Sequence, residues 1–252
     1  MSLLLVITLF VLGAVIASFI GVVVARIHTG TSFLTGRSRC DACDAPLTLL
    51  SLVPVLSYTV SRGRAQCCGA HISFVAPLSE VLLGWLFVLT YLNIGFSAVL
   101  PFMLASLALL LGIVLYDLSH QILPPTLLYL FVAVSAATGF LASPAGFSSV
   151  LLIAASIGGS LAALHFLSRG RAMGLADAPL AFGLALLTGP AALPGFIFSF
   201  WIGAVVGIAM LVQRPRGSRI GVEVPFAPFL AAGFLLAYFT QWNPLILIAA
   251  SL

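Results

Sequence analysis

Hydrophobic positions along this chain form long, nearly unbroken runs separated by short polar connections. Several runs approach the roughly 20 residues that an α-helix needs to cross about 30 Å of hydrocarbon. None of them alternates apolar and polar residues, as the strands of a membrane barrel do. The pattern therefore predicts about eight transmembrane helices, at residues 1–26, 77–93, 98–116, 125–142, 147–168, 177–189, 194–212 and 225–240.

The composition agrees with a membrane protein, because 62% of the 252 residues are hydrophobic and only 6% are charged. A soluble globule of this length could not bury so much apolar surface. The first run is too long for a signal-peptide core and lacks a preceding basic residue, so we expect it to be retained. We predict an all-α, polytopic protein with three parts: a first transmembrane helix (1–26), a cysteine-containing loop (27–76) and a membrane domain (77–252).

The basic residues predict the orientation of these helices. All ten are arginines, and every one follows the first, fifth or seventh predicted span, while the connections on the opposite side carry none. Arginine-bearing loops face the cytosol, which places the N-terminus outside. Topology thus accounts for the net charge of +4, and we do not expect nucleic acid as a partner.

Two of the six acidic residues lie at the ends of predicted membrane helices. Asp117, in YDLSHQILPP, ends the third span, and Asp177, in RGRAMGLADAPL, begins the sixth. Under the predicted topology both lie at the cytosolic membrane surface. Two close carboxylates can share one proton, so that one acts as a general base on water while the other polarises a scissile carbonyl. The pattern is therefore typical of an aspartyl hydrolase.

Two other interpretations of these aspartates stay open at this point. Asp117 could be a solvated residue at a helix end, and Asp177 could be the N-cap of its helix, with Pro179 in the first turn. Carboxylates in membranes also serve as proton relays in transporters. Transporter sites usually lie near the bilayer midplane, however, where no charged residue is predicted here.

The loop between the first two spans contains every cysteine of the chain. On the cytosolic side a structural disulfide is disfavoured, and Cys40 and Cys43 have the C-x-x-C spacing of zinc ligands. Cys67 and Cys68 follow about twenty-five residues later, as the second half of a zinc ribbon does. We predict a structural zinc site at Cys40, Cys43, Cys67 and Cys68, with His71 as the alternative to Cys67 for the fourth ligand.

Taken together, these motifs resemble the type IV prepilin peptidases, which are membrane aspartyl endopeptidases. The resemblance covers nearly the whole length, in the family's order and spacing, and rests on ASFIGVVVARI, RSRCDAC, LVPVLSYTVSRGRAQCC, ISFVAPLSE, YDLSHQILP, MGLADAPL and VPFAPFLAAG. It implies that Asp117 and Asp177 are the catalytic aspartates. It also implies a location in the bacterial inner (cytoplasmic) membrane.

The implied substrates are type IV prepilins or type II secretion pseudopilins. Such a preprotein has a short basic leader that ends in glycine and is followed by a hydrophobic helix. Many family members with a long cysteine-bearing loop also methylate the new N-terminal amine with S-adenosylmethionine. No residue of this sequence is assigned to that cofactor.

The chain departs from the family pattern at several positions. Ala176 replaces a glycine just before the second aspartate, and Pro179 replaces a lysine two residues after it. Ala65 replaces the first cysteine of the second pair, with Cys67 displaced beside Cys68. These departures keep a second hypothesis open, in which the protein binds pilin-like substrates as an assembly factor without cutting them. Glu80 has two possible roles: it could bind substrate or cofactor, or it could be an acidic residue in the first turn of a helix, where it faces the positive end of the helix dipole.

Overall fold

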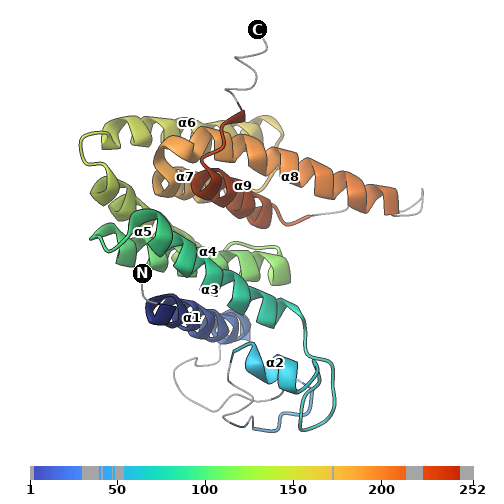
Figure 1. Cartoon of the computed structure of the whole chain (residues 1–252). Coiled ribbons are helices and arrows are strands. Elements are labelled where there is room, and N and C mark those ends of the chain that lie inside the picture. The colour runs from blue at the N-terminus through green and yellow to red at the C-terminus, as the bar shows by residue number, and fades with distance from the viewer. Residues whose placement is uncertain are drawn as a thin grey trace. The chain divides into compact units, whose positions relative to one another are not determined.

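The computed structural model describes residues 3–29, 40, 42–46, 48, 54–171, 173–213 and 224–244. The prediction of an all-helical protein is confirmed, since these ranges contain helices and no β-strand. The helices are α1 (Leu3–Thr29), α2 (Leu56–Val60), α3 (Val75–Ile94), α4 (Val99–His120), α5 (Pro125–Ala142), α6 (Phe147–Leu167), α7 (Asp177–Thr188), α8 (Ala192–Gln213) and α9 (Ala227–Thr240), with a 3₁₀ turn at Gly189–Ala191 between α7 and α8 (Figure 1).

Apart from the short α2, each helix lies where a transmembrane segment is predicted. Within the described ranges, six segments are long and apolar enough to cross a membrane, counting Asp177–Gln213 as one. By itself α7 has 12 residues, which span about 18 Å, and α9 is also shorter than a full span. The N-terminus-outside orientation stays a prediction, as does the division at residues 26 and 76.

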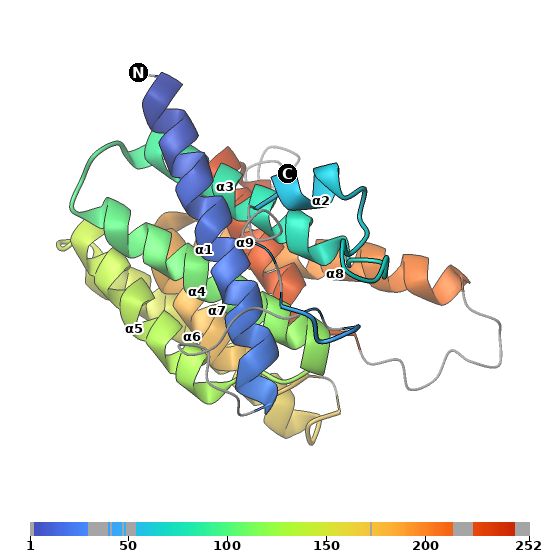
Figure 2. The same ribbon diagram turned by 90° about the horizontal axis from the view of Figure 1, so that it is seen from below.

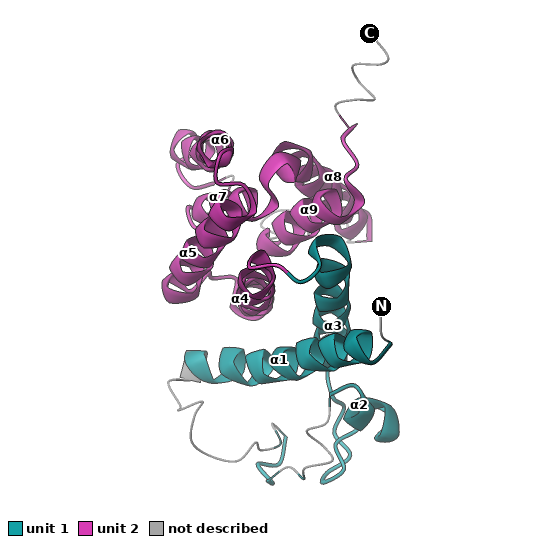
Figure 3. Cartoon of the chain, turned by 60° about the vertical axis from the view of Figure 1, so that its left-hand side comes forward, with its two compact units in different colours: residues 1–96 teal, residues 97–252 magenta. Residues whose placement is uncertain are grey.

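The chain forms two compact units, residues 1–96 and 97–252, which Figure 3 colours separately. In the first unit α1 packs along α3. A Cβ added to Gly13 would lie 2.8 Å from the Cα of Gly84, so the two backbones touch at this point. Small residues that let helices approach so closely are typical of packing in membranes.

In the second unit α7 is the central helix. It packs against α5, α6 and α9 (Figure 1 and Figure 2), and most of its residues are buried. Of the outer helices, α4 packs on α5 and α9, and α8 packs on α9. Because neighbours surround α7, the position of its first residue, Asp177, is set by packing on several sides.

Candidate active site

Asp117 lies in the last turn of α4 and is only 6% exposed. The helix continues past it to His120 and ends where Gln121 adopts a left-handed conformation, with φ of 55°. The backbone N–H of Gln121 donates to the carbonyl of Asp117 over 2.8 Å. The alternative of a solvated helix-end residue is therefore wrong, since this carboxyl group is buried inside the helical bundle.

Asp177 is the first residue of α7 and is 8% exposed. The N-cap position belongs to Ala176, so the N-cap interpretation of Asp177 is also wrong. Ala176 has φ of −70°, an ordinary helical value, so the glycine that the family usually has here is not required by the backbone.

The loop before α7 is held by a histidine that the sequence does not mark as functional. His165, near the end of α6, hydrogen-bonds through Nδ1 to the carbonyl oxygen of Met173 over 2.8 Å. Since a carbonyl only accepts, Nδ1 is the donor. Gly170, with φ of +77°, lets the loop pass the imidazole ring closely. This contact fixes the chain four residues before Asp177.

Asp117 contacts the start of α9. The backbone N–H of Ala227 donates to Oδ2 of Asp117 over 3.2 Å. This N–H is one of the four at a helix start that have no partner within the helix. The carboxyl groups of Asp117 and Asp177 are close enough for their charges to interact. The second unit thus gathers a helix C-terminus, two helix N-termini and two buried carboxyl groups.

Ala227 is a site residue that the analysis of the sequence missed. The only signal was the pair Pro225 and Pro228, which marks the start of a helix on the predicted cytosolic side. A backbone donor leaves no side-chain signature, so the sequence could not show that this helix start contacts Asp117.

In the first unit, the sulfur atoms of Cys40, Cys43, Cys67 and Cys68 all lie within 4.8 Å of one another. The separations include 3.8 Å between Cys40 and Cys68 and 3.3 Å between Cys43 and Cys67. In a tetrahedral zinc site with Zn–S bonds of about 2.3 Å, sulfurs lie roughly 3.8 Å apart. The four thiols therefore fit zinc, and Cys67 belongs to the cluster, whereas His71 pairs with Arg64 in an isolated antiparallel bridge.

Two turns with the same hydrogen-bond pattern present these cysteines. In the first, Cys40 N–H donates to the Ala45 carbonyl (2.9 Å) and Asp44 N–H donates to the Cys40 carbonyl (2.8 Å). In the second, Ala65 N–H donates to the Ala70 carbonyl (2.8 Å) and Gly69 N–H donates to the Ala65 carbonyl (2.7 Å). The equivalence matches Ala65 to Cys40 and Cys68 to Cys43, so Cys67 supplies its sulfur from a different position of the turn.

The thiols of the cluster differ in acidity. Backbone N–H groups of Ala42 and Cys43, with smaller side-chain contributions, lower the pKa of Cys40 to about 7. Hydrogen bonding with the sulfurs of Cys43 and Cys40 raises the pKa of Cys67 to about 12. A metal ion that takes all four sulfurs would have to displace protons, most of all from Cys67.

Glu80 has a different role from the two that its sequence position suggests. It lies in the second turn of α3, is 8% exposed, and accepts a hydrogen bond of 2.7 Å from the backbone N–H of Val55. Val55 is the N-cap of α2 and has φ of +60°, an unusual conformation for a β-branched residue. The buried carboxylate thus fixes the segment that leads to the second cysteine turn.

Comparison with known proteins agrees with these features. The family described as "Bacterial Peptidase A24 N-terminal domain" matches residues 11–94. A "Prepilin leader peptidase/N-methyltransferase" of Bacillus subtilis is 30% identical over 231 residues, which cover 91% of this chain and 92% of that protein. A protein of the same description from Myxococcus xanthus is 34% identical, covering 82% of this chain and 64% of its own. No solved structure matches. The chain belongs to the prepilin leader peptidase/N-methyltransferase family.

Proposed function

We propose that this protein is a multi-pass aspartic endopeptidase of the bacterial inner membrane, which removes the short basic leader from type IV prepilins or type II secretion pseudopilins at the cytosolic face. The observation that carries this proposal is the meeting of Asp117 and Asp177, two buried carboxyl groups from α4 and α7 whose charges interact. A buried pair of this kind is costly unless it is used.

The pair can supply both proton transfers of peptide hydrolysis. One carboxylate takes a proton from water as the water oxygen attacks the carbonyl carbon, and the other, protonated, donates a hydrogen bond to the carbonyl oxygen. The C–N bond then breaks, and the carboxyl group that took the proton from water gives it to the departing amine, which restores the starting protonation of the pair. The Ala227 N–H holds Oδ2 of Asp117, which orients this carboxyl group before the substrate arrives.

The cysteine cluster is proposed as a structural zinc site. Zinc bound by Cys40, Cys43, Cys67 and Cys68 would join the two turns and stabilise the loop between α1 and α3. It takes no part in the hydrolytic step. Methylation of the new N-terminus is a second proposed activity, supported by the names of the relatives, and S-adenosylmethionine is the methyl donor that the resemblance implies.

The test is cleavage of a purified prepilin by the full-length protein in detergent, with the product's N-terminus read by mass spectrometry. Asp117→Asn and Asp177→Asn should each lower the cleavage rate by roughly 10³-fold or more. Ser119→Ala is the matched control, because this exposed side chain lies two residues from Asp117 and its hydroxyl donates to the carbonyl oxygen of Leu115, in the same helix, over 2.9 Å. It should retain the rate of the unmodified protein.

The outcomes separate the hypotheses. An extra 14 Da (about one methylene) on the product after S-adenosylmethionine is added would establish methylation. If the unmodified protein binds prepilin but never cuts it, the peptidase proposal fails and the non-cleaving assembly factor replaces it.

A further inference from the structure

The same four residues, Ser-Arg-Gly-Arg, follow the short helix α2 and the long helix α6, at 61–64 and 168–171. In both places the backbone forms a Schellman motif. After α2, the N–H of Gly63 donates to the carbonyl of Tyr58 over 3.0 Å, and the N–H of Arg62 donates to that of Thr59 over 3.3 Å. The two equivalent bonds after α6 measure 2.8 and 3.2 Å. The chain therefore builds one turn twice, once in each unit.

Each turn presents two arginines beside exposed apolar side chains. The first arginine is left-handed in both, with φ of 51° at Arg62 and 53° at Arg169, although glycine is the usual residue at this position of the motif. All four arginines of the two turns are exposed. Just before the turns, Val60 is 68% exposed and Leu167 is 85% exposed. A surface that combines guanidinium groups with apolar side chains fits a boundary between water and hydrocarbon.

The turn after α6 lies at such a boundary. Because α6 is long and apolar enough to cross a membrane, the residues that follow it lie at the level of the lipid headgroups. Arginine side chains there bind lipid phosphate, while their apolar neighbours stay in hydrocarbon. The turn after α2 has the same chemistry, but α2 has only five residues, which span about 8 Å. This second turn must reach the membrane in another way.

Contacts within the first unit hold α2 at the start of a membrane helix. The ring of Tyr58 packs edge-on against that of Phe74, with centroids 6.1 Å apart, and the N–H of Ile72 donates to the Gly63 carbonyl over 2.9 Å. Phe74 directly precedes α3, which is a candidate membrane span. Figure 1 and Figure 2 show α2 beside this end of α3. Two residues extend at most about 7 Å, so Ile72 lies close to the point where α3 enters the hydrocarbon.

The exposed residues of this region form a set that we call the α2 face: Leu56, Val60, Arg62, Arg64, Ile72 and Phe74. Its four apolar members are between 38% and 68% exposed, and its two charged members are both cations. Of the described acids of this unit, Glu80 is buried against Val55, and Asp44 belongs to the first cysteine turn. Basic and apolar side chains side by side are complementary to a bilayer that contains anionic lipids.

We propose that the α2 face binds the membrane surface at which α3 begins. Arg62 and Arg64 contact the phosphate groups of anionic lipids, and the four apolar side chains insert between the headgroups. Since Cys67 follows Arg64 by three residues, this contact also ties the second cysteine turn to the bilayer. The proposal does not rest on the peptidase activity, because it concerns a surface of the first unit and its binding of lipid.

Hydrogen exchange of the full-length protein tests the proposal in nanodiscs of phosphatidylcholine alone and of phosphatidylcholine mixed with phosphatidylglycerol. An arginine near an anionic surface favours binding by roughly fivefold. Exchange across residues 56–64 should therefore be slower in the anionic bilayer by roughly 5- to 25-fold. Added salt should remove this difference, because it screens the surface charge. Equal exchange in the two bilayers would overturn the proposal.

Paired arginine variants locate the effect. Replacing both arginines of the α2 face, Arg62→Gln with Arg64→Gln, should abolish the difference between the bilayers, whereas Arg62→Lys with Arg64→Lys should keep most of it. The matched control is Arg169→Gln with Arg171→Gln, which removes the same charge from the identical turn of the second unit. It should leave exchange across residues 56–64 unchanged. If the control also abolishes the difference, net charge is responsible and the proposal fails.

Two further arms identify what covers the face. Inorganic phosphate added in detergent should not slow exchange across residues 56–64, because it offers no apolar layer; slowing would indicate an ion site and overturn the proposal. A photoreactive benzophenone amino acid in place of Val60, which is exposed on α2, should cross-link to lipid in the anionic bilayer. A cross-link to protein alone, either a second copy or another chain, would replace the membrane surface with a protein partner.

Discussion

The close packing of α7 against α5 and α6 predicts a graded response to three glycine-to-alanine substitutions. A Cβ added at Gly139, on α5, would lie 2.6 Å from the backbone oxygen of Leu186. At Gly158, on α6, the nearest atoms are the Cβ of Phe182 at 3.1 Å and the carbonyl oxygen of Ala178 at 3.2 Å. At Gly159, the next residue, no atom lies within 4 Å. Gly159→Ala is thus a matched control.

The expected magnitudes follow from these distances. Ordinary contact begins near 3.5 Å, so Gly139→Ala must push α5 and α7 apart by roughly 0.9 Å and should destabilise the protein by about 1–3 kcal/mol. Gly158→Ala needs a shift of only a few tenths of an ångström and should cost less than about 1 kcal/mol. Gly159→Ala should be neutral or stabilising by up to about 1 kcal/mol, since alanine is the better helix former.

Thermal unfolding of the three variants in one detergent measures this order. At roughly 2–4 °C per kcal/mol, Gly139→Ala should lower Tm by about 2–12 °C, Gly158→Ala by about 4 °C or less, and Gly159→Ala not at all. Equal shifts for all three, or the largest shift at Gly159, would refute the conclusion that backbone contact fixes α7.

Three further predictions concern the residues that support the two sites. Glu80→Ala leaves the backbone N–H of Val55 without its acceptor, which should cost about 1–3 kcal/mol of stability and speed hydrogen exchange across α2. Glu80→Gln keeps an oxygen acceptor, so its exchange rate should lie between that of Glu80→Ala and that of the unmodified protein. His165→Ala should lower kcat by roughly 10- to 100-fold with little change in KM, because it frees the loop before Asp177. His165→Asn, whose amide can also donate a hydrogen bond, should recover part of this loss. An unchanged kcat in His165→Ala would contradict the role of His165. Cys67→Ala should release zinc, and the double variant Ala65→Cys, Cys67→Ala should again bind one equivalent of zinc. Metal analysis and the rate of zinc transfer to a chelator measure both effects. If the double variant binds no zinc, the two turns are not equivalent.

The helices were predictable where proline and polar residues mark their ends. The α5 helix runs from Pro125 to Ala142, as predicted, because proline precedes and opens it and a Ser-Pro pair follows it. For α4 the predicted end at residue 116 is four residues early. A drop in hydrophobicity marks where the apolar run stops, but the backbone stays helical until Gln121 turns left-handed.

The components of the candidate sites were predictable to different degrees. Asp117, Asp177 and the four cysteines stand out because charged residues and thiols are rare in this chain. The contact from Ala227 to Asp117 joins residues 110 positions apart through a backbone donor, so no pattern of side chains encodes it. The contact between Glu80 and Val55 also uses a backbone donor, so the side-chain pattern does not encode it either. Sequence patterns identify the reactive groups, whereas the backbone donors that orient these groups require the folded chain.

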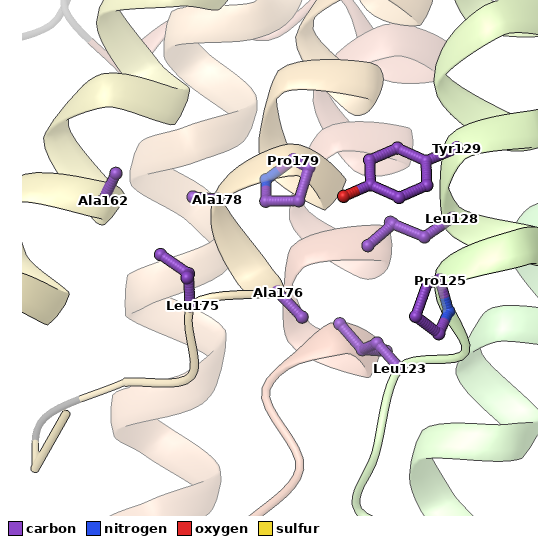
Figure 4. A pocket seen from close by; sticks show the side chains of 9 residues that line it. All are labelled: Leu123, Pro125, Leu128, Tyr129, Ala162, Leu175, Ala176, Ala178 and Pro179. Atoms are coloured by element: carbon purple, nitrogen blue, oxygen red, sulfur yellow. The ribbon is translucent and has the colours of Figure 1, made fainter.

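The geometry around Asp177 also bears on whether the departures from the family pattern disable the carboxylate pair. Ala176 has a helical backbone, so its methyl group causes no conformational strain. Pro179 is the third residue of α7, within the first turn, where a missing N–H breaks no intrahelical bond. The donor to Asp117 comes from the backbone of α9 and does not depend on either substitution. Both substituted residues line a cavity beside the start of α7, whose other lining residues are also uncharged (Figure 4). These contacts give no conformational reason for the departures to disable the carboxylate pair, which favours the proposed peptidase over the non-cleaving assembly factor.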